Sequence, residues 1–205
     1  MEVASVGPGL TRVHKMTRSL KGSPLATENS NTACVARSET SGGPAVSAAE
    51  LEGNFEYLQI AKDEGAEVLW GGDRLTEGDL EHGHFMSPAV IGGVKNTMRI
   101  AQEEVFGPVI GVVKAGDFDE AIELANDIKY GLSASIITRD INKAMKYTDR
   151  IEAGVVKINQ ISTGLALQVP FGGVKHSSSN NFKEQGQNAI DFYTRIKSVY
   201  LDYSG

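Results

Sequence analysis

The sequence is poor in cysteine, has fewer bases than acids, and lacks long hydrophobic runs. Cys34 is the only cysteine, which excludes an internal disulfide and a zinc site of several thiolates. Apolar runs such as Val109–Val113 are far shorter than the roughly 18 residues of a membrane helix, and Glu2 and Pro8 interrupt any signal-peptide core. The net charge of −6 disfavours a general nucleic-acid binder. We therefore expect a cytoplasmic protein without nucleic-acid or membrane partners.

Glycine is the residue in excess, with 23 in 205 positions and no collagen-like period. This excess predicts many tight connections between strands and helices. Residues 1–46 are dense in Ser, Thr, Asn and Gly without an apolar period, and we interpret them as an irregular segment. Residues 47–190 form the expected core, and residues 191–205 the expected helix end and C-terminal strand.

Helix and strand patterns alternate from Ser47 onward. Ser47 and Glu50 form a capping box, and Gly65 is typical of the position after a helix end. Asp117 and Asp140 are candidate caps of two further helices. The expected inward faces of the three helices are, in order, Leu51, Phe55, Leu58 and Ala61; Ala121, Leu124 and Ala125; and Ile141, Ala144, Met145, Thr148 and Ile151.

Apolar strands are predicted between these helices. The expected strands are residues 68–70, 109–113, 132–138 and 155–158, with a further strand or extended connection at 84–91. A last helix is expected at 187–193, and a terminal strand at 198–202. Strands that are apolar on both faces and alternate with helices predict a three-layer α/β/α fold with a mainly parallel sheet.

Four blocks of sequence are not explained by local structure. They are Gln-Glu-Glu-Val-Phe-Gly-Pro at 102–108, Glu-Ala-Gly-Val-Val-Lys-Ile-Asn at 152–159, Pro-Phe-Gly-Gly-Val-Lys at 170–175, and Ala-Asn-Asp at 125–127 followed by Tyr-Gly-Leu at 130–132. In their order along the chain and in their spacing, these blocks resemble the C-terminal half of the aldehyde dehydrogenase superfamily. The resemblance implies oxidation of an aldehyde to a carboxylic acid with NAD or NADP, and a C-terminal strand used in homo-oligomers.

A finer resemblance lies near the C-terminus. Thr-Gly-Leu at 163–165, Ser-Ser at 177–178, Phe-Lys-Glu-Gln-Gly at 182–186 and Asp-Phe-Tyr-Thr at 191–194 are the residues that carry it. They are similar to the subgroup that oxidises 2,5-dioxovalerate, also called α-ketoglutarate semialdehyde. The resemblance therefore implies a semialdehyde substrate.

Glu104 is the candidate cofactor-binding residue. An ionised carboxylate before a Gly-Pro turn can accept hydrogen bonds from both ribose hydroxyls of a nicotinamide nucleotide. From the residues alone, a solvated acidic pair ahead of a turn is the favoured interpretation. The resemblance implies the cofactor role for Glu104, with Phe106 packing near the nicotinamide ribose.

Phe171 and Leu165 are the candidate substrate-binding residues. The resemblance places Phe171 on the wall of the aldehyde funnel and Leu165 at a second wall position, whereas a lone aromatic residue at such a corner is more commonly a core residue. Asn159 follows a buried strand, and the resemblance implies a loop-fixing hydrogen bond. The four histidines form no metal-binding pattern, so no metal ligand is predicted.

The catalytic machinery of the family is not recognised in this sequence. An aldehyde dehydrogenase uses a cysteine thiolate, a general base and a nucleotide-binding domain. Cys34 lies only nine residues before Gly43, closer than in the family, so we interpret it as an incidental thiol in a polar loop rather than the nucleophile. The isolated chain is therefore expected to be inactive. The alternative is a non-catalytic remnant that pairs with full-length subunits; the sequence leaves NAD against NADP, the exact aldehyde and the oligomeric state open.

Overall fold

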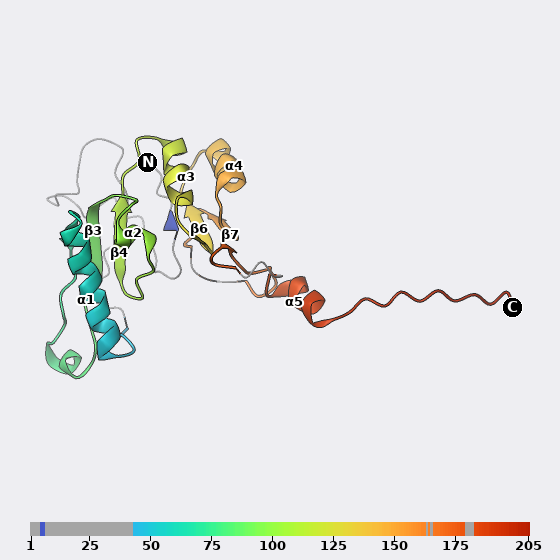
Figure 1. The fold of residues 1–205 in the computed structure, drawn as a ribbon, viewed down its shortest axis with the longest axis horizontal. Helices are drawn as coiled ribbons and strands as arrows, with labels where there is room; N and C mark the ends of the chain where they lie inside the picture. The colour runs from blue at the N-terminus through green and yellow to red at the C-terminus, as the bar shows by residue number, and fades with distance from the viewer. Residues whose placement is uncertain (1–4, 7–42, 163, 165, 179–182) are drawn as a thin grey trace.

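The fold consists of a body of strands and helices and an extended C-terminal tail (Figure 1). The computed structural model describes residues 5–6, 43–162, 164, 166–178 and 183–205. Cys34, Leu165 and most of the segment predicted to be irregular lie outside these described residues.

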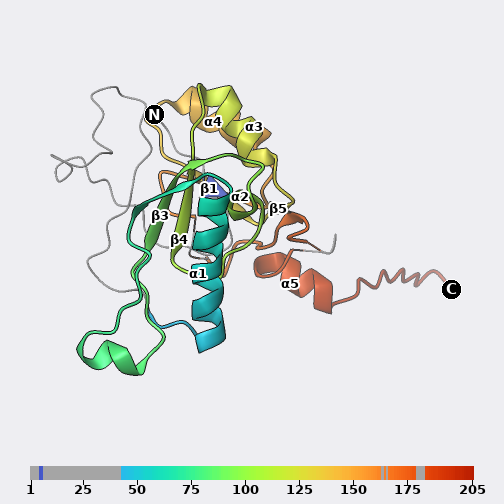
Figure 2. The same ribbon diagram turned by 60° about the vertical axis from the view of Figure 1, so that its left-hand side comes forward.

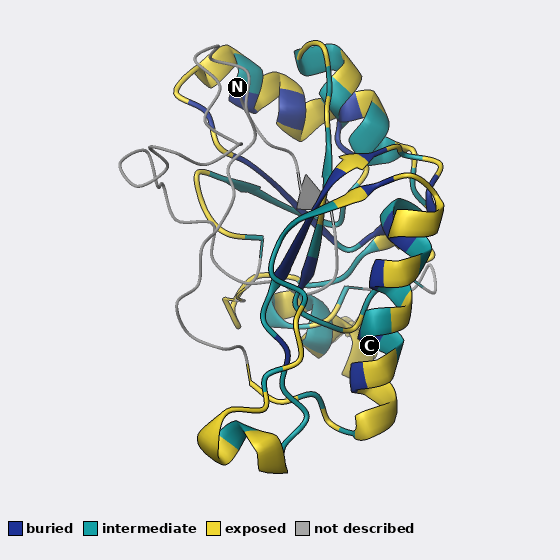
Figure 3. Ribbon diagram, turned by 90° about the vertical axis from the view of Figure 1, so that its left-hand side faces the viewer, coloured by how far each residue is buried: buried dark blue, intermediate teal, exposed yellow. Residues whose placement is uncertain are grey.

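Helix α1 (Ala48–Asp63) forms where the capping box predicts it. The hydroxyl oxygen of Ser47 accepts a hydrogen bond from the backbone N–H of Glu50 at 3.2 Å. Gly65, just past the helix end, has φ = +94°, a conformation that glycine adopts at little cost. Of the predicted inward face, Leu51, Leu58 and Ala61 are buried, and the opposite side faces solvent (Figure 3).

The first sheet packs against α1. Its strands are β2 (Glu67–Trp70), β3 (Ala89–Val94) and β4 (Val109–Val113). Strand β3 runs antiparallel to β2 and parallel to β4, and it is buried at every position except Gly93. Helix α2 (Arg99–Gln102) and the 3₁₀ helix η1 (Gly78–His82) lie in the flanking loops. The core here includes Leu51, Leu58, Ile91, Val94, Met98 and Ile100.

The second core forms around β6 (Ser133–Ile136) and β7 (Val155–Ile158), which pair in parallel. Strand β1 (Ser5–Val6) adds antiparallel to the other edge of β6. Helices α3 (Phe118–Asn126) and α4 (Ile141–Arg150) lie together beside these strands (Figure 2). The buried residues are Ile122, Ala134, Ile136, Tyr147 and Ile151. The predicted α/β class is confirmed, with parallel pairs at β3–β4 and β6–β7 and antiparallel strands beside them.

The inward faces of α3 and α4 agree with the predicted ones only in part: Ala144 and Ile151 are buried as predicted, and Ala125 packs partly buried against the second core. Ile122, and not the predicted Ala121, Leu124 and Ala125, is the buried residue of α3. In α4 the predicted Ile141 and Met145 are 69% and 54% exposed, whereas Tyr147 is 1% exposed. Burial of a large side chain removes more apolar area from water, and the Tyr147 hydroxyl keeps a partner by donating to the carbonyl of Ser135 at 3.3 Å. Burial also raises the pKa of Tyr147.

The C-terminal part leaves the body. Strands β5 (Tyr130–Gly131) and β8 (Val174–Lys175) pair antiparallel, and helix α5 (Gly186–Tyr193) follows. Residues 198–202, predicted as a strand, are extended and exposed, and no strand among the described residues pairs with them to supply the hydrogen bonds that a strand requires. No helix in the described parts of the chain is long and apolar enough to cross a membrane.

Candidate functional site

Glu103 and Glu104 follow α2, in the turn that leads to β4. The Glu103 carboxylate accepts hydrogen bonds from Nε and Nη2 of Arg99 at 3.0 and 2.9 Å. It accepts a third from the hydroxyl of Tyr57, on α1, at 2.9 Å. The Arg99 guanidinium, and after it the Tyr57 hydroxyl, hold the pKa of Glu103 below its ordinary value. Glu103 is therefore committed to contacts within the protein.

Glu104 is the open member of this pair. Its side chain is half-buried, and its carboxylate has no hydrogen-bond or ion-pair partner among the described residues. Phe106, two residues on, is 73% exposed. An ionised carboxylate retains all its acceptor sites when no protein donor uses them. The structure thus leaves the predicted cofactor-binding residue, and not its neighbour, free to accept a ligand's hydroxyl groups.

Gly107, in the same turn, packs closely against Asn54 of α1. A Cβ at this position would come within 2.1 Å of Oδ1 of Asn54, so the buried side chain of Asn54, on α1, leaves no room for one. Pro108 then joins the sheet, because its carbonyl accepts from the N–H of Ala89 at 2.8 Å. The turn at residues 103–108 is therefore held between α1 and β3.

Phe171 lies at the start of the Pro170–Lys175 segment and is half-buried. Its N–H and C=O exchange two hydrogen bonds of 2.6 Å with Glu184, in an isolated antiparallel bridge. A Cβ on Gly154 would lie 1.8 Å from the carbonyl oxygen of Gly172, which means that the start of β7 and this segment touch backbone to backbone. Leu165, the second predicted wall residue, lies outside the described residues, and the predicted roles of both residues stay predictions.

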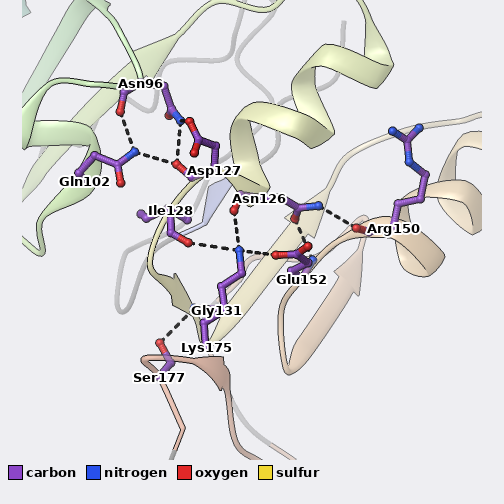
Figure 4. Close-up of polar contacts among 10 residues, drawn as sticks. All are labelled: Asn96, Gln102, Asn126, Asp127, Ile128, Gly131, Arg150, Glu152, Lys175 and Ser177. Atoms are coloured by element: carbon purple, nitrogen blue, oxygen red, sulfur yellow. Dashed lines mark hydrogen bonds and ion pairs between the residues drawn. The ribbon is translucent and has the colours of Figure 1, made fainter.

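The end of α3 joins the two candidate segments (Figure 4). Nε2 of Gln102, two residues before Glu104, donates to the carbonyl of Asp127 at 2.7 Å. From the other side, Nζ of Lys175 donates to the carbonyls of Asn126 and Ile128. Cationic and N–H donors at a helix C-terminus satisfy its free carbonyls and complement the helix dipole. The structure thereby attaches both the turn at residues 103–108 and the Pro170–Lys175 segment to the three residues Asn126–Ile128.

Side chains of the motif blocks complete this junction. The Asn126 amide donates to the carbonyl of Arg150 and accepts from the N–H of Glu152, both at 2.8 Å. The Glu152 carboxylate pairs with Nζ of Lys175 at 2.5 Å (Figure 4). Motif membership marked Asn126, Glu152 and Lys175 as noteworthy in the sequence, but their mutual contacts span up to 49 positions and no local pattern encodes them.

Asn159 performs the predicted loop-fixing role. It has φ = +56°, and its Oδ1 accepts a hydrogen bond from the N–H of Thr138 at 2.9 Å. The end of β7 is thereby tied to the loop after β6. No group of three or more potential metal ligands occurs in the described portions of the chain.

Known proteins of similar sequence and structure identify the family of this chain. A sequence model of the aldehyde dehydrogenase family matches residues 20–199. The chain is 53% identical over 162 residues to an alpha-ketoglutarate semialdehyde dehydrogenase of Haloferax volcanii, covering 78% of this chain and 33% of that protein. It is 46% identical over 159 residues to an alpha-ketoglutaric semialdehyde dehydrogenase of Bacillus subtilis, covering 78% and 32%. The chain thus spans about a third of the length of these curated relatives.

A solved structure gives the same assignment. Betaine aldehyde dehydrogenase of Staphylococcus aureus, determined in complex with NAD⁺, superposes with a TM-score of 0.70 at 38% identity, over 74% of this chain and 29% of that one. The family match covers more than half of the chain, and the predicted resemblance to the semialdehyde-oxidising subgroup is confirmed by the relatives. The chain belongs to the aldehyde dehydrogenase family.

Proposed function

We propose that this chain forms part of an NAD- or NADP-dependent enzyme that oxidises a semialdehyde, of the α-ketoglutarate semialdehyde type, to a carboxylic acid. The names of the relatives support the substrate class. The proposal rests on the difference between two neighbouring carboxylates. Glu103 accepts hydrogen bonds from Arg99 and Tyr57, whereas the carboxylate of Glu104 has no partner among the described residues.

Glu104 fits the ribose of a nicotinamide nucleotide by its chemistry. The two ribose hydroxyls are donors, and a half-buried carboxylate with unused oxygens accepts two such bonds more strongly than a solvated one. Phe106, exposed beside it, offers an apolar surface to the same group. When bound, the nucleotide supplies the hydride acceptor. In this proposal the chain binds the ribose, and Phe171 and Leu165 form part of the wall of the aldehyde funnel.

The 205-residue polypeptide alone is proposed to be inactive. Its only cysteine, Cys34, lies in a polar stretch whose spacing does not match the family nucleophile. A cytoplasmic location is part of the same proposal. The second candidate function, a non-catalytic partner of full-length subunits, is favoured by one observation: the exposed apolar side chains of the C-terminal tail, Ile196, Val199, Tyr200, Leu201 and Tyr203.

We also propose that this tail pairs as a strand with another subunit of its own kind. Residues 194–205 are extended, and their backbone groups form no sheet hydrogen bonds among the described residues. An unpaired extended segment rich in apolar side chains is a template for pairing with another chain. Pairing would bury those side chains and satisfy the backbone donors and acceptors together.

A hybrid enzyme tests the proposed activity. Residues 43–205 replace the matching segment of the Haloferax volcanii relative, and NAD- or NADP-dependent oxidation of 2,5-dioxopentanoate is measured. The hybrid is expected to turn over, and Glu104→Gln is expected to weaken nucleotide affinity about tenfold or more, the loss of a charge-assisted hydrogen bond. Glu123→Gln, on the exposed side of α3, removes the same charge and serves as control. Unchanged affinity and turnover in Glu104→Gln would contradict the cofactor role.

A further inference from the structure

Two lysines near Phe171 bind backbone carbonyls in the same way but differ in their counter-ions. Lys175 binds the carbonyls of Asn126 and Ile128 and also pairs with the Glu152 carboxylate. Lys183 donates to the carbonyls of Gly154 and Gly172 at 2.7 and 2.8 Å. Within the described residues, no carboxylate lies within ion-pair distance of the Lys183 ammonium.

The missing counter-ion has an electrostatic consequence. Lys183 is half-buried, so solvent screens its charge less than that of a surface lysine. Two neutral carbonyls occupy two of the three ammonium protons and leave the third for another acceptor. A partly desolvated cation that is held in place, with a donor unused, is a preorganised partner for an anion.

The position of Lys183 indicates which anion it binds. A Cβ on Gly172 would lie 3.5 Å from Cγ of Lys183, so the lysine stem runs along the backbone next to Phe171. Glu184, the following residue, pairs with the backbone of Phe171. The cation is therefore fixed to the segment that is proposed to form the wall of the aldehyde funnel.

We propose that Lys183 binds the carboxylate at the far end of the substrate, and so selects aldehydes that carry a carboxylate over uncharged ones. This inference rests on the proposed function, because it takes Phe171 as part of the funnel wall. A semialdehyde has one reacting end and one anionic end, and the anionic end needs a cation or several N–H donors when it leaves water. Lys183 supplies that cation, and Lys175, already neutralised by Glu152, does not.

The test measures ligand binding to the full 205-residue chain, without turnover. 2-Oxoglutarate, the acid produced from α-ketoglutarate semialdehyde, is titrated into protein with ¹³C-labelled lysine, and the Cε resonance of Lys183 is followed by NMR. The wild type is expected to show a saturable shift of this resonance, and the uncharged dimethyl ester of 2-oxoglutarate none. Lys183→Gln, which keeps a donor for the carbonyls, is expected to weaken binding about tenfold or more, measured by calorimetry.

Two controls keep the result interpretable. Lys197→Gln removes the same charge from the exposed tail and is expected to leave the affinity unchanged. Lys183→Arg retains the charge and is expected to retain binding even where Lys183→Gln perturbs the fold, which circular dichroism reports. Absence of binding by the wild type, or equal weakening in Lys183→Gln and Lys197→Gln, would overturn the inference. Lys183 would then have only the structural role of binding the two backbone carbonyls.

The failure of this inference is separable from the failure of the proposed function. Carboxylate binding that depends on Lys183, together with an inactive hybrid enzyme, would refute the proposed activity but not the anion site. An active hybrid enzyme, together with a 205-residue chain that does not bind 2-oxoglutarate, would refute the anion site alone.

Discussion

Gln102 and Lys175 bind adjacent carbonyl groups at the end of α3, although 73 positions separate them in the sequence. Gln102 holds the carbonyl of Asp127, and Lys175 holds those of Asn126 and Ile128. The first residue leads into the turn with Glu104, and the second ends the segment with Phe171. The segments that hold the candidate residues Glu104 and Phe171 are therefore positioned by one shared stretch of backbone, and a change in one segment is expected to affect the other.

Lys175→Met is expected to destabilise the chain. The Lys175 side chain is 22% exposed, and its removal leaves two carbonyls and the Glu152 carboxylate without their cationic partner. Unsatisfied groups of this kind cost about 1–3 kcal/mol in the free energy of unfolding, measured by urea denaturation. Glu152→Gln, which keeps an acceptor at the same place, serves as the milder comparison. Equal stability of Lys175→Met and wild type would show that water replaces the lysine without cost.

Gly107→Ala is expected to strain the turn at residues 103–108. The added Cβ would lie 2.1–2.5 Å from the side-chain amide of Asn54, which is itself 3% exposed. Overpacking of this kind costs about 1–3 kcal/mol in the free energy of unfolding. The double variant with Asn54→Ala provides room and is expected to recover much of the loss, as a double-mutant cycle would show. Additive effects of the two substitutions would contradict the contact.

Sequence patterns predicted what is local and missed what is long-range. The caps at Ser47, Asp117 and Asp140 fix helix starts through contacts within three residues, so those helices were predictable. The motif around Glu104 marked the turn. The ion pair of Glu103 with Arg99 is also local, at four positions, whereas the hydrogen bond from Tyr57 could not be predicted because it spans 46 positions.

The rotation of a helix about its axis and the pairing of strands also depend on contacts between residues that lie far apart in the sequence. Burial of Ile122 in place of Ala121 and Leu124 depends on how α3 is rotated against the second core, which a nine-residue apolar pattern does not determine. The strand expected at 198–202 needs a partner strand for its hydrogen bonds, and its own alternating pattern cannot supply one. Lys183 belongs to the Phe-Lys-Glu-Gln-Gly motif, but its contacts could not be predicted, because its partners Gly154 and Gly172 lie 29 and 11 positions away in the sequence.

Ile122→Ala tests the corrected face of α3. Ile122 is 1% exposed and contacts the second core, so truncation leaves a cavity and is expected to lower the free energy of unfolding by about 2–5 kcal/mol. Ile141→Ala makes the same chemical change at a position that is 69% exposed, and is expected to cost less than about 0.5 kcal/mol. Thermal or urea unfolding of both variants checks the difference. A loss at Ile122 no larger than that at Ile141 would contradict the burial of Ile122 in the second core.

The carboxylate of Glu103 is expected to make stability depend on pH at the acidic end. Its folded-state pKa is lowered, first by the hydrogen bonds from Arg99 and then by the one from Tyr57. The stabilisation is therefore fully present above the unfolded pKa of about 4.3 and is lost as the pH falls through the lowered folded-state value. NMR titration of Glu103 should show this pKa rising more in Arg99→Gln than in Tyr57→Phe. Because the pKa of Asp119 is also lowered, the contribution of Glu103 is read as the difference in acid unfolding between wild type and Glu103→Gln.

Tyr200→Pro is expected to abolish the proposed pairing of the C-terminal tail. Proline removes a backbone donor and is not tolerated within a paired strand, while the apolar character of the neighbouring Val199 and Leu201 is kept. The variant therefore separates strand pairing from simple hydrophobic contact. Sedimentation velocity should show association of the wild-type chain that rises with concentration, and a monomer for Tyr200→Pro. Ile141→Lys, which removes an exposed apolar side chain from α4, is expected to associate like the wild type; a monomer there as well would move the contact from the tail to the helix face.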